Sequence, residues 1–549
     1  MEAAIAPPED RQKALGAFYT PPEIAAQLAQ WAIRSTEDLV LDPSFGGLAF
    51  LDAAAARLQG MGLSGPEASA RLWGVDIDSD AMAAAANTGT PLSNLVHEDF
   101  FAVAPGEVPA VDVLLGNPPY IRYQAFNGSG ERARELASAA GVRITKLASS
   151  WAPFVVHGTS FISPGGRMAQ VLPAEILHAQ YATEVLEFLR REFGSVSLVT
   201  FEERVFPGAL EEVVLLLADR RGEAGRADIQ LLSCKAVDDL DLSTPSTRSD
   251  LVEDELGAES LLAQLLPAEA RRLLVRLAVS PQVVRLGALA SVDIGIVTGA
   301  NEFFMLPCDR AEPIADDLLR AGVSKAAHIP GARLDREEHA DLLAGGGAGM
   351  IFVATLSEEP ATLETARLHI RDAEKLGLQD RYKCRIRNPW WSLPVPAAGP
   401  PELLLTYCSN DFPRLTLNEV GALHTNTLHA VRPTDPALAA TLAASFYNSL
   451  TLLSCELEGR SYGGGVLKLE PSEAERLLIP EPAAGNEALL NEVDDAVRAR
   501  NLQRVLDLVD QAVLIDGCGL TEDDVAALRE GRKQLADRRR SRGRAPAGT

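Results

Sequence analysis

The chain has 549 residues, more than one ordinary domain holds, so two to four domains are expected, each with its own core. Its formal net charge of −25 argues against a surface that is basic throughout, so a polyanionic partner would have to bind a local basic patch. The sequence contains no apolar run of membrane-spanning length and no secretory signal, which predicts a cytoplasmic protein. Six scattered cysteines without a CxxC pair indicate reduced thiols, so neither a zinc site nor a disulfide framework is expected.

The first predicted helix follows the sequence Gly16-Ala-Phe-Tyr-Thr-Pro-Pro22. Proline suits the first turn of a helix, and Thr20 stands where a hydroxyl caps the first backbone N–H groups. Apolar residues then recur at helical spacing. The pattern predicts a helix opened by Pro21 and Pro22, with Thr20 as its cap.

A short apolar strand is predicted at residues 39–41, and Asp42-Pro-Ser-Phe-Gly-Gly47 then turns into a second helix. Two glycines at a strand-to-helix turn let a ligand approach the backbone closely. This segment is weaker evidence than GxGxxG, and no P-loop is present. Taken alone, it fits an ordinary turn equally well.

The next two predicted strands, at residues 72–76 and 95–96, each lead to an acidic residue. Asp76 closes the first of them, where nucleotide-binding α/β domains place an acceptor for ribose hydroxyls. Asp99 follows the second and suits an adenine amine, while Phe100 offers a ring that stacks on a purine. Strand ends of this kind meet at one edge of a sheet, so these side chains are expected to line one crevice with the glycine turn.

A fourth strand at residues 111–115 runs through Gly116 into Asn117-Pro-Pro-Tyr120. The two prolines remove backbone donors, so nearby carbonyls are able to face outward as acceptors. An amide, a prolyl carbonyl and an aromatic ring within four residues suit a flat substrate that bears an amine. A proline turn with a packed tyrosine is the structural alternative, which the polar strand ends around it disfavour.

Three further strands, at residues 168–172, 196–201 and 213–217, complete an α/β domain with a Rossmann-like sheet of seven strands. The polar stretch after Tyr120 is a candidate lid, and Val205-Phe-Pro-Gly208 is a second aromatic-proline loop. Four parts of the chain are expected: an α/β domain over residues 1–235, an acidic linker over 236–270, a mixed α+β domain over 271–485, and a helical segment with a basic tail over 486–549.

Two basic patches occur in the later part of the chain. The first combines cations with tryptophans: Arg381, Lys383, Arg385, Arg387, Trp390 and Trp391. Phosphate contact with aromatic stacking is one interpretation of this patch, and a solvated charged loop is the other. The second patch, residues 532–544, is typical of a disordered, non-specific tether, and the glycine run at 463–465 predicts a tight turn.

Over roughly residues 14–220 the chain resembles the amino-group DNA methyltransferases that methylate adenine at N6, in the class whose methylase domain precedes the target-recognition domain. The motifs that carry the resemblance are residues 16–21 and 42–51, Asp76, Asp99-Phe100 and Asn117-Pro-Pro-Tyr120. The sequence departs from the family at Phe45, where a small residue or cysteine is usual, and at Leu48, where a third glycine is common. Beyond residue 220 the resemblance is looser, and Thr298-Gly-Ala-Asn301 and Tyr462-Gly-Gly-Gly465 are only reminiscent of recognition domains.

The resemblance implies S-adenosylmethionine as methyl donor, double-stranded DNA as partner and no metal. Asp42 would approach the amino group of the cofactor, Asp76 its ribose, and Asp99 and Phe100 its adenine. The full set of implied cofactor contacts is Tyr19, Thr20, Asp42, Ser44, Gly46, Asp76, Ile77, Asp99, Phe100 and Asn117.

The resemblance also implies a catalytic set of Asn117, Pro118, Tyr120 and Phe206. The target adenine must leave the duplex, because its amine is otherwise engaged in the base pair. Tyr120 and Phe206 would then clamp the extruded ring, and Asn117 Oδ1 with the Pro118 carbonyl would accept from N6. Neither acceptor is a strong base, so catalysis would depend on orientation and polarisation.

The same four-residue motif serves enzymes that methylate a glutamine amide or an RNA base, so an RNA or protein N-methyltransferase is the alternative. The long stretch after the methylase region is sufficient for duplex recognition and favours DNA. A non-catalytic binding subunit is disfavoured because all the crevice residues are present, and a fused nuclease because the region before Gly16 is short. A separate restriction endonuclease or defence partner is therefore expected.

Overall fold

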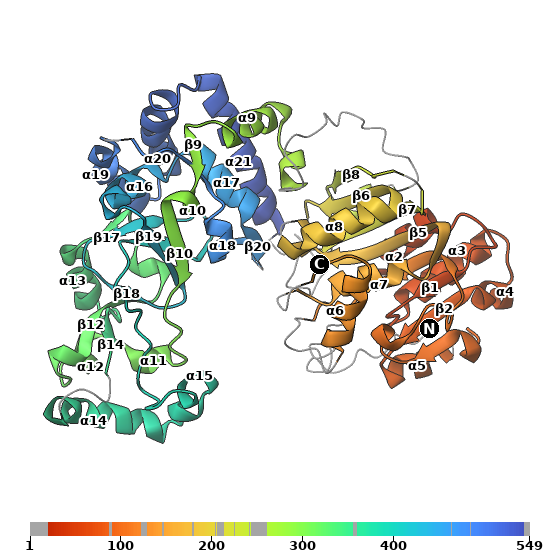
Figure 1. Ribbon diagram of the computed structural model, residues 1–549, viewed down its shortest axis with the longest axis horizontal. Helices are drawn as coiled ribbons and strands as arrows, with labels where there is room; N and C mark the ends of the chain where they lie inside the picture. Colours follow the sequence, from red (N-terminus) through yellow and green to blue (C-terminus); the bar gives the residue numbers. More distant parts are fainter. Residues whose placement is uncertain are drawn as a thin grey trace. The chain divides into compact units, whose positions relative to one another are not determined.

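The computed structural model describes residues 20–86, 90–121, 129–144, 148–177, 180–203, 205, 213–223, 225–240, 242, 261–354, 360–462, 464–483 and 485–542. The chain divides into two compact units (Figure 1). The first comprises Met1–Leu265, Tyr462–Gly464 and Ser541–Thr549, and the second comprises Leu266–Ser461 and Gly465–Arg540. The division therefore falls inside the predicted 236–270 linker, and the helices predicted as a separate C-terminal segment belong to the second unit as far as Arg540.

The first unit is built on a sheet with strand order β3-β2-β1-β4-β5-β7-β6-β8. Its strands are β1 (Val40–Asp42), β2 (Leu72–Asp76), β3 (Leu95–His97), β4 (Val111–Gly116), β5 (Ile162–Pro173), β6 (Phe193–Phe201), β7 (Val213–Arg221) and β8 (Ile229–Cys234). Neighbours among β1 to β5 are parallel, β7 is antiparallel to β5 and β6, and β8 is parallel to β6. The predicted α/β class is confirmed, with eight strands where the sequence predicted seven. The additional strand, β8, is half-exposed at the sheet edge, so its apolar signal is weak.

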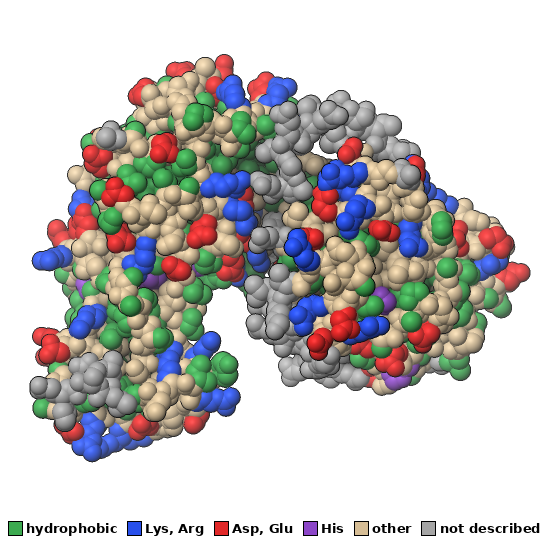
Figure 2. Space-filling model, in the orientation of Figure 1, with side chains coloured by type: hydrophobic (Ala, Val, Ile, Leu, Met, Phe, Trp, Pro, Cys, Tyr) green, Lys and Arg blue, Asp and Glu red, His purple; other side chains and the backbone are tan. Residues whose placement is uncertain are grey.

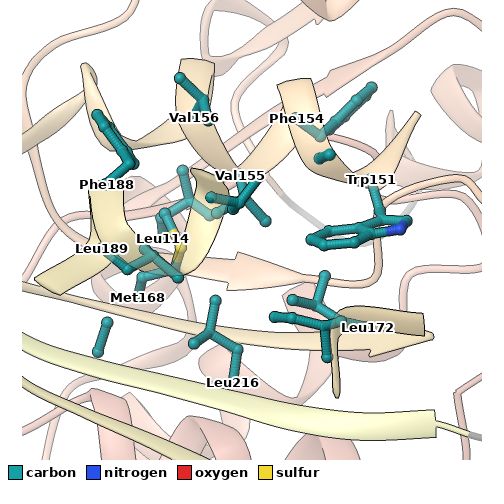
Figure 3. Packing of buried hydrophobic residues seen from close by; sticks show 14 of the residues in the cluster. Leu114, Trp151, Phe154, Val155, Val156, Met168, Leu172, Phe188, Leu189 and Leu216 are labelled. Carbon is teal, nitrogen blue, oxygen red and sulfur yellow. The ribbon is translucent and has the colours of Figure 1, made fainter. Parts of the chain in front are cut away.

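Helices cover both faces of this sheet. They are α2 (Pro22–Ala32), α3 (Ala49–Gly60), α4 (Gly65–Ala70), α5 (Ser79–Ala86), α6 (Gly130–Ala139), α7 (Trp151–Thr159) and α8 (Gln180–Glu192). Strand β4 alternates between two buried clusters, because Leu114 packs in one and Val113 and Leu115 in the other. Figure 3 shows the first cluster, in which side chains of α7 and α8 lie over Leu114 and the apolar residues of β5 and β7. A sheet covered on both faces needs near-continuous apolar strands, which is why the sequence reveals the central strands clearly.

The second unit is a mixed α+β body, as predicted. Its largest sheet has the order β10 (Ala290–Ile294), β19 (Leu428–Pro433), β15 (Leu403–Thr406), β17 (Leu415–Asn418) and β13 (Arg333–Leu334). A second sheet has the order β11 (Met305–Leu306), β14 (Met350–Phe352), β12 (Leu319–Val323) and β18 (Leu423–His424). Two smaller sheets contain β16 (Cys408–Ser409), β21 (Val466–Lys468) and β20 (Arg460–Tyr462), and β22 (Leu478–Pro480) with β9 (Val283–Arg285).

The helices of the second unit are mostly short. They are α9 (Ala268–Ala278), α10 (Leu286–Leu289), α11 (Asn301–Phe304), α12 (Cys308–Ala311), α13 (Arg336–Ala344), α14 (Pro360–Lys375), α15 (Tyr382–Arg385), α16 (Ala439–Ser445), α17 (Ser449–Glu458), α18 (Pro471–Ala474), α19 (Leu490–Arg498), α20 (Leu502–Val509) and α21 (Glu522–Arg542). Among the residues described, no single helix is long and apolar enough to cross a membrane, although the bent pair Pro436–Ser445 and Ser449–Glu458 meets that test by length and composition alone.

The basic C-terminal patch is largely ordered, which corrects the prediction of a disordered tether. Helix α21 continues to Arg542, and Arg539 within it is buried. Its guanidinium pairs with the buried Glu456 at 2.8 Å and also donates to the carbonyls of Asn410 and Gly465. The prediction failed because these three acceptors come from distant segments that a local charge count does not reveal.

Candidate active site

The carboxylate of Asp42 lies at the carboxyl end of β1 and is 1% exposed. Its Oδ1 accepts the backbone N–H of Ser44 at 3.1 Å, whereas no described residue hydrogen-bonds to Oδ2. Burial raises the pKa of Asp42 to about 8, and the nearby charge of Asp76 acts in the same direction. A Cβ on Gly116 would lie 2.8 Å from Oδ1, so glycine at that position leaves room for the acid. A buried carboxyl with an unsatisfied oxygen is suited to a cationic ligand group.

The glycine turn after β1 is tied to the end of β2. The N–H of Gly46, at φ +42°, donates to Asp76 Oδ2 at 2.8 Å, and the N–H of Asp78 donates to Oδ1 at 2.8 Å. Burial raises the pKa of Asp76 as well. Leu48, which stands where the family often has glycine, adopts a left-handed φ of 70°. The turn therefore keeps a glycine-like backbone, and Ile77 beside Asp76 stays exposed.

Asp99 has a local structural role in addition to the predicted cofactor contact. Its Oδ1 accepts the N–H of Phe101 at 3.0 Å and so caps a short 3₁₀ turn, and its Oδ2 accepts the hydroxyl of Ser129. Phe100 is only 3% exposed. Its ring packs at centroid distances of 5.1, 4.8 and 5.2 Å against Phe154, His157 and Phe161. Phe100 is thus a core side chain, and its predicted stacking on the cofactor stays a prediction.

The amide of Asn117 is held on both sides. Its Nδ2 donates to Thr20 Oγ1 at 3.2 Å, and its Oδ1 accepts the hydroxyl of Tyr120 at 2.7 Å. The Tyr120 hydroxyl also lies 3.0 Å from the Val171 carbonyl. The predicted capping role of Thr20 is wrong: the N-cap residue is Pro21 and no side-chain cap bond forms. The buried Thr20 hydroxyl accepts from the Asn117 NH₂ group instead, which directs Oδ1 to the other side.

The backbone of the Asn-Pro-Pro-Tyr loop is fastened by two serines. Ser44 Oγ donates to the Asn117 carbonyl at 3.2 Å, and Ser150 Oγ donates to the Pro119 carbonyl. Ser150 also exchanges bonds with the backbone of Ile121 at 2.8 and 2.9 Å. Among the described residues no donor reaches the carbonyl of Pro118, which lies between the two fastened ones. Sequence reasoning missed Ser150, whose position before α7 gives no local signal of this contact.

Several predicted groups fall outside the described residues. They are Tyr19, Phe206 and residues 122–128 of the candidate lid, which the sequence predicts from Ile121 to Gly130. Their roles remain predictions. Thr20, Asp42, Ser44 and Asn117 are linked by the contacts above, so the structure brings the turn after β1 and the Asn-Pro-Pro-Tyr loop together, and Gly46 joins the same turn to Asp76.

The predicted DNA-contacting patch of the second unit divides into packed and exposed side chains. Arg381 pairs with Glu302 at 2.6 Å, and Arg387 donates to the carbonyls of Val297 and Thr298. Both arginines therefore brace the fold.

The two tryptophans of this patch are half-buried against the apolar cluster around Phe303 and Phe304. Trp390 lies 4.8 Å from the ring of Phe303 and donates from Nε1 to Glu374 at 3.1 Å. Both indoles are thus partly packed in the core of the second unit, and their stacking on a base stays a prediction. Lys383 and Arg385 stay exposed and have no ion-pair partner among the described residues.

The Asn-Pro-Pro-Tyr loop and the glycine turn follow neighbouring parallel strands, β4 and β1, at the carboxyl edge of this mixed sheet. A family model described as N-6 DNA Methylase matches residues 8–191, and one described as the C-terminal domain of Type II methyltransferase M.Eco57I matches residues 258–514. The chain is a DNA methyltransferase, and residues 8–191 are similar to the N-6 DNA methylases.

Relatives resemble the chain over most of its length. Type II methyltransferase M.XamI of Xanthomonas campestris pv. amaranthicola is 27% identical over 482 residues, which cover 85% of each chain. Type II methyltransferase M.AccI of Acinetobacter calcoaceticus is 20% identical and covers 84% of this chain and 85% of the relative.

Solved structures match the chain at low identity, and MmeI shares its fold. The type IIL restriction-modification enzyme MmeI, in complex with DNA, is 11% identical with a TM-score of 0.51, over 96% of this chain and 75% of that one. The type IIG restriction endonuclease BpuSI is 15% identical with a TM-score of 0.40, and the match spans 96% of this chain and 66% of that enzyme.

Proposed function

We propose that the protein transfers the methyl group of S-adenosylmethionine to N6 of an adenine in double-stranded DNA, as the modification enzyme of a type II restriction-modification system. The observation that carries this proposal is the placement of the Asn117 amide, whose NH₂ group donates to Thr20 and whose Oδ1 accepts the Tyr120 hydroxyl, next to the Pro118 carbonyl, to which no described residue donates. The type II methyltransferases M.XamI and M.AccI support the restriction-modification setting. A separate endonuclease of the same specificity is the partner that such a system requires.

The buried acid at the end of β1 fits the proposed cofactor. Asp42 Oδ2 is buried without a described partner, and an ammonium group would satisfy it. Asp76 would accept from the ribose, and the Gly46 turn leaves the backbone open to close approach. S-adenosylmethionine supplies a methyl group made electrophilic by its sulfonium.

The residues of the chain act on the adenine by holding its amine. Because N6 is engaged in the duplex, the base must first be extruded. Asn117 Oδ1 and the Pro118 carbonyl then accept from the two N–H groups, which draws the nitrogen lone pair out of conjugation with the ring and aims it away from these acceptors. Tyr120 contributes a ring for stacking, worth about 1–3 kcal/mol per base, and its hydroxyl is anchored at the Val171 carbonyl. Phe206 is proposed as the second stacking side chain.

The test compares the parent protein with an Asn117→Ala variant. Label transfer from the cofactor to duplex DNA is expected to fall by about 10²–10³-fold, as when one oriented polar group of an active site is removed. Affinity for the cofactor, measured by calorimetry, should change far less. Sequencing of the modified DNA then identifies the methylated base, with single-stranded RNA and translation factors as parallel substrates. Equal transfer rates for parent and variant would refute the mechanism, and methylation of RNA or protein alone would refute the substrate.

A further inference from the structure

The short helix α15 and the residue after it present an unusual surface on the second unit. Tyr382 and Ile386 are 62% and 60% exposed, although both are large apolar side chains. Lys383 Nζ and the Arg385 guanidinium carbon each lie 5.6 Å from the centre of the Tyr382 ring. Neither cation has an ion-pair partner among the residues described. In Figure 2, Lys and Arg side chains gather with hydrophobic ones at the end of the second unit that carries α15.

The inner side of α15 is fixed to the turn at residues 297–299. Arg387 donates to the carbonyl of Thr298 at 2.8 Å, and the thiol of Cys384 lies 3.8 Å from the same oxygen. Gly299, at φ +80°, leaves no room for a side chain, because a Cβ there would lie 2.7 Å from Lys383 Cβ. The exposed side chains are therefore presented from a braced backbone rather than from a loose loop.

The Thr298-Gly-Ala-Asn301 sequence thereby acquires a role. Thr298 Oγ1 bonds to Asn301 Oδ1 and accepts the N–H of Ala300 at 3.3 Å, which closes the turn on itself. The carbonyls of this turn point toward Arg381 and Arg387. The 298–301 turn therefore packs against α15, so the Thr298-Gly-Ala-Asn301 sequence and the basic patch form one structural element.

Duplex DNA is the partner whose chemistry matches this surface. The chain as a whole carries a net charge of −25, yet here two cations without an ion-pair partner among the described residues flank apolar side chains. Phosphates complement such cations, and apolar side chains of DNA-binding proteins contact sugars and base edges or insert at base steps. Resting on the proposed function, in which duplex DNA is the substrate, we propose that α15 is a DNA-contacting element: Lys383 and Arg385 bind phosphates, and Tyr382 and Ile386 contact the adjoining groove.

The test measures DNA binding directly and does not depend on methyl transfer. Full-length protein is titrated against a fluorescent duplex at several salt concentrations. Removing two phosphate contacts in a Lys383→Gln/Arg385→Gln variant should weaken binding and reduce the slope of log K against log salt by about 2. A Tyr382→Ala/Ile386→Ala variant should weaken binding with the slope unchanged.

Matched control variants distinguish an effect specific to α15 from the general effect of removing positive charge or exposed apolar surface. Arg504→Gln/Lys533→Gln removes the same charge from other exposed positions of the second unit, and Leu368→Ala/Leu376→Ala removes comparably exposed apolar side chains. All variants should retain the parent's cofactor affinity and thermal unfolding. Unchanged DNA affinity in the α15 variants, or an equal loss in the controls, would overturn the proposal. So would unchanged DNA binding by Tyr382→Ala/Ile386→Ala combined with loss of self-association in sedimentation, because the exposed side chains would then contact a second copy of the chain. Failure of the parent to methylate duplex DNA would instead refute the proposed function.

Discussion

Replacing Asp42 with asparagine is expected to stabilise the ligand-free protein while weakening cofactor binding. Burial raises the pKa of Asp42 to about 8 in the folded chain, whereas an unfolded aspartate titrates near 3.9. A raised pKa gives stability that is fully present below pH 4 and is lost as the pH rises through 8. With about 1.4 kcal/mol per unit, the loss at pH 8 is on the order of 5 kcal/mol. Asparagine keeps the shape of the side chain and its acceptor for the Ser44 N–H but carries no charge.

Calorimetric unfolding of parent and Asp42→Asn between pH 5 and 9 measures this effect. Part of the gain is offset because the new amide N–H groups are buried, at about 1–3 kcal/mol. The remaining difference of about 2–4 kcal/mol should raise the unfolding temperature of the methylase unit by several degrees at pH 8. The difference should shrink toward pH 5, where the parent's acid is neutral when folded and the unfolded acid is closer to its own pKa.

Cofactor binding should change in the opposite direction. Removing one partner of a buried ion pair costs about 3–5 kcal/mol, so S-adenosylhomocysteine, which keeps the amino group, should bind about 10²–10³-fold more weakly to the variant. Near pH 7 the parent must also release a proton from Asp42 on binding, which appears as a dependence of the binding heat on the buffer. Equal affinities and equal unfolding temperatures for parent and variant would refute this account of the site.

Three further substitutions test other contacts. Thr20→Val removes the acceptor of the Asn117 amide, so methyl transfer should show kcat lowered about tenfold with KM nearly unchanged. Thr20→Ser keeps the hydroxyl and should retain the rate. A Thr20→Val enzyme with the parent's kcat would contradict the orienting role of this hydroxyl. Arg167→Met leaves the buried Asp38 without its ion-pair partner and should lower the free energy of unfolding by about 3–5 kcal/mol in denaturant titrations. Adding Asp38→Asn should restore part of this loss. A loss below about 1 kcal/mol would show that the ion pair does not stabilise the fold. Gly299→Ala places a side chain on a left-handed backbone against α15, so it should lower the free energy of unfolding by about 1–3 kcal/mol and weaken DNA binding. Unchanged DNA affinity would show that the contact between the 297–299 turn and α15 is not needed for binding.

The strand ends that build the site could be predicted because they belong to central strands. Residues of β1, β2 and β4 are buried on both faces, so their apolar runs stop abruptly at Asp42, Asp76 and Asn117. Strand β8 was not predicted, because an edge strand with half-exposed residues lacks a continuous apolar run.

The contacts that orient the site could not be predicted, because they join residues far apart in the chain. Thr20 and Asn117 are 97 positions apart, and Ser150 lies 31 positions from the carbonyl it fastens. Local patterns indicated a helix cap for Thr20, and tertiary packing gave its hydroxyl another partner. In the same way, sequence alone did not distinguish the packed Trp390 from the exposed Tyr382, since both are aromatic residues in one basic stretch.

The buried pair of Arg539 and Glu456 affects the order in which the protein folds during synthesis. Arg539 is translated 83 residues after Glu456, near the end of the second unit. Packing of that unit is therefore completed only after about 275 residues have followed Leu265, which takes roughly 14 to 55 s at ribosomal rates. During this interval the strands of the first unit have already been translated, so its sheet is able to assemble before the body proposed to contact DNA is finished.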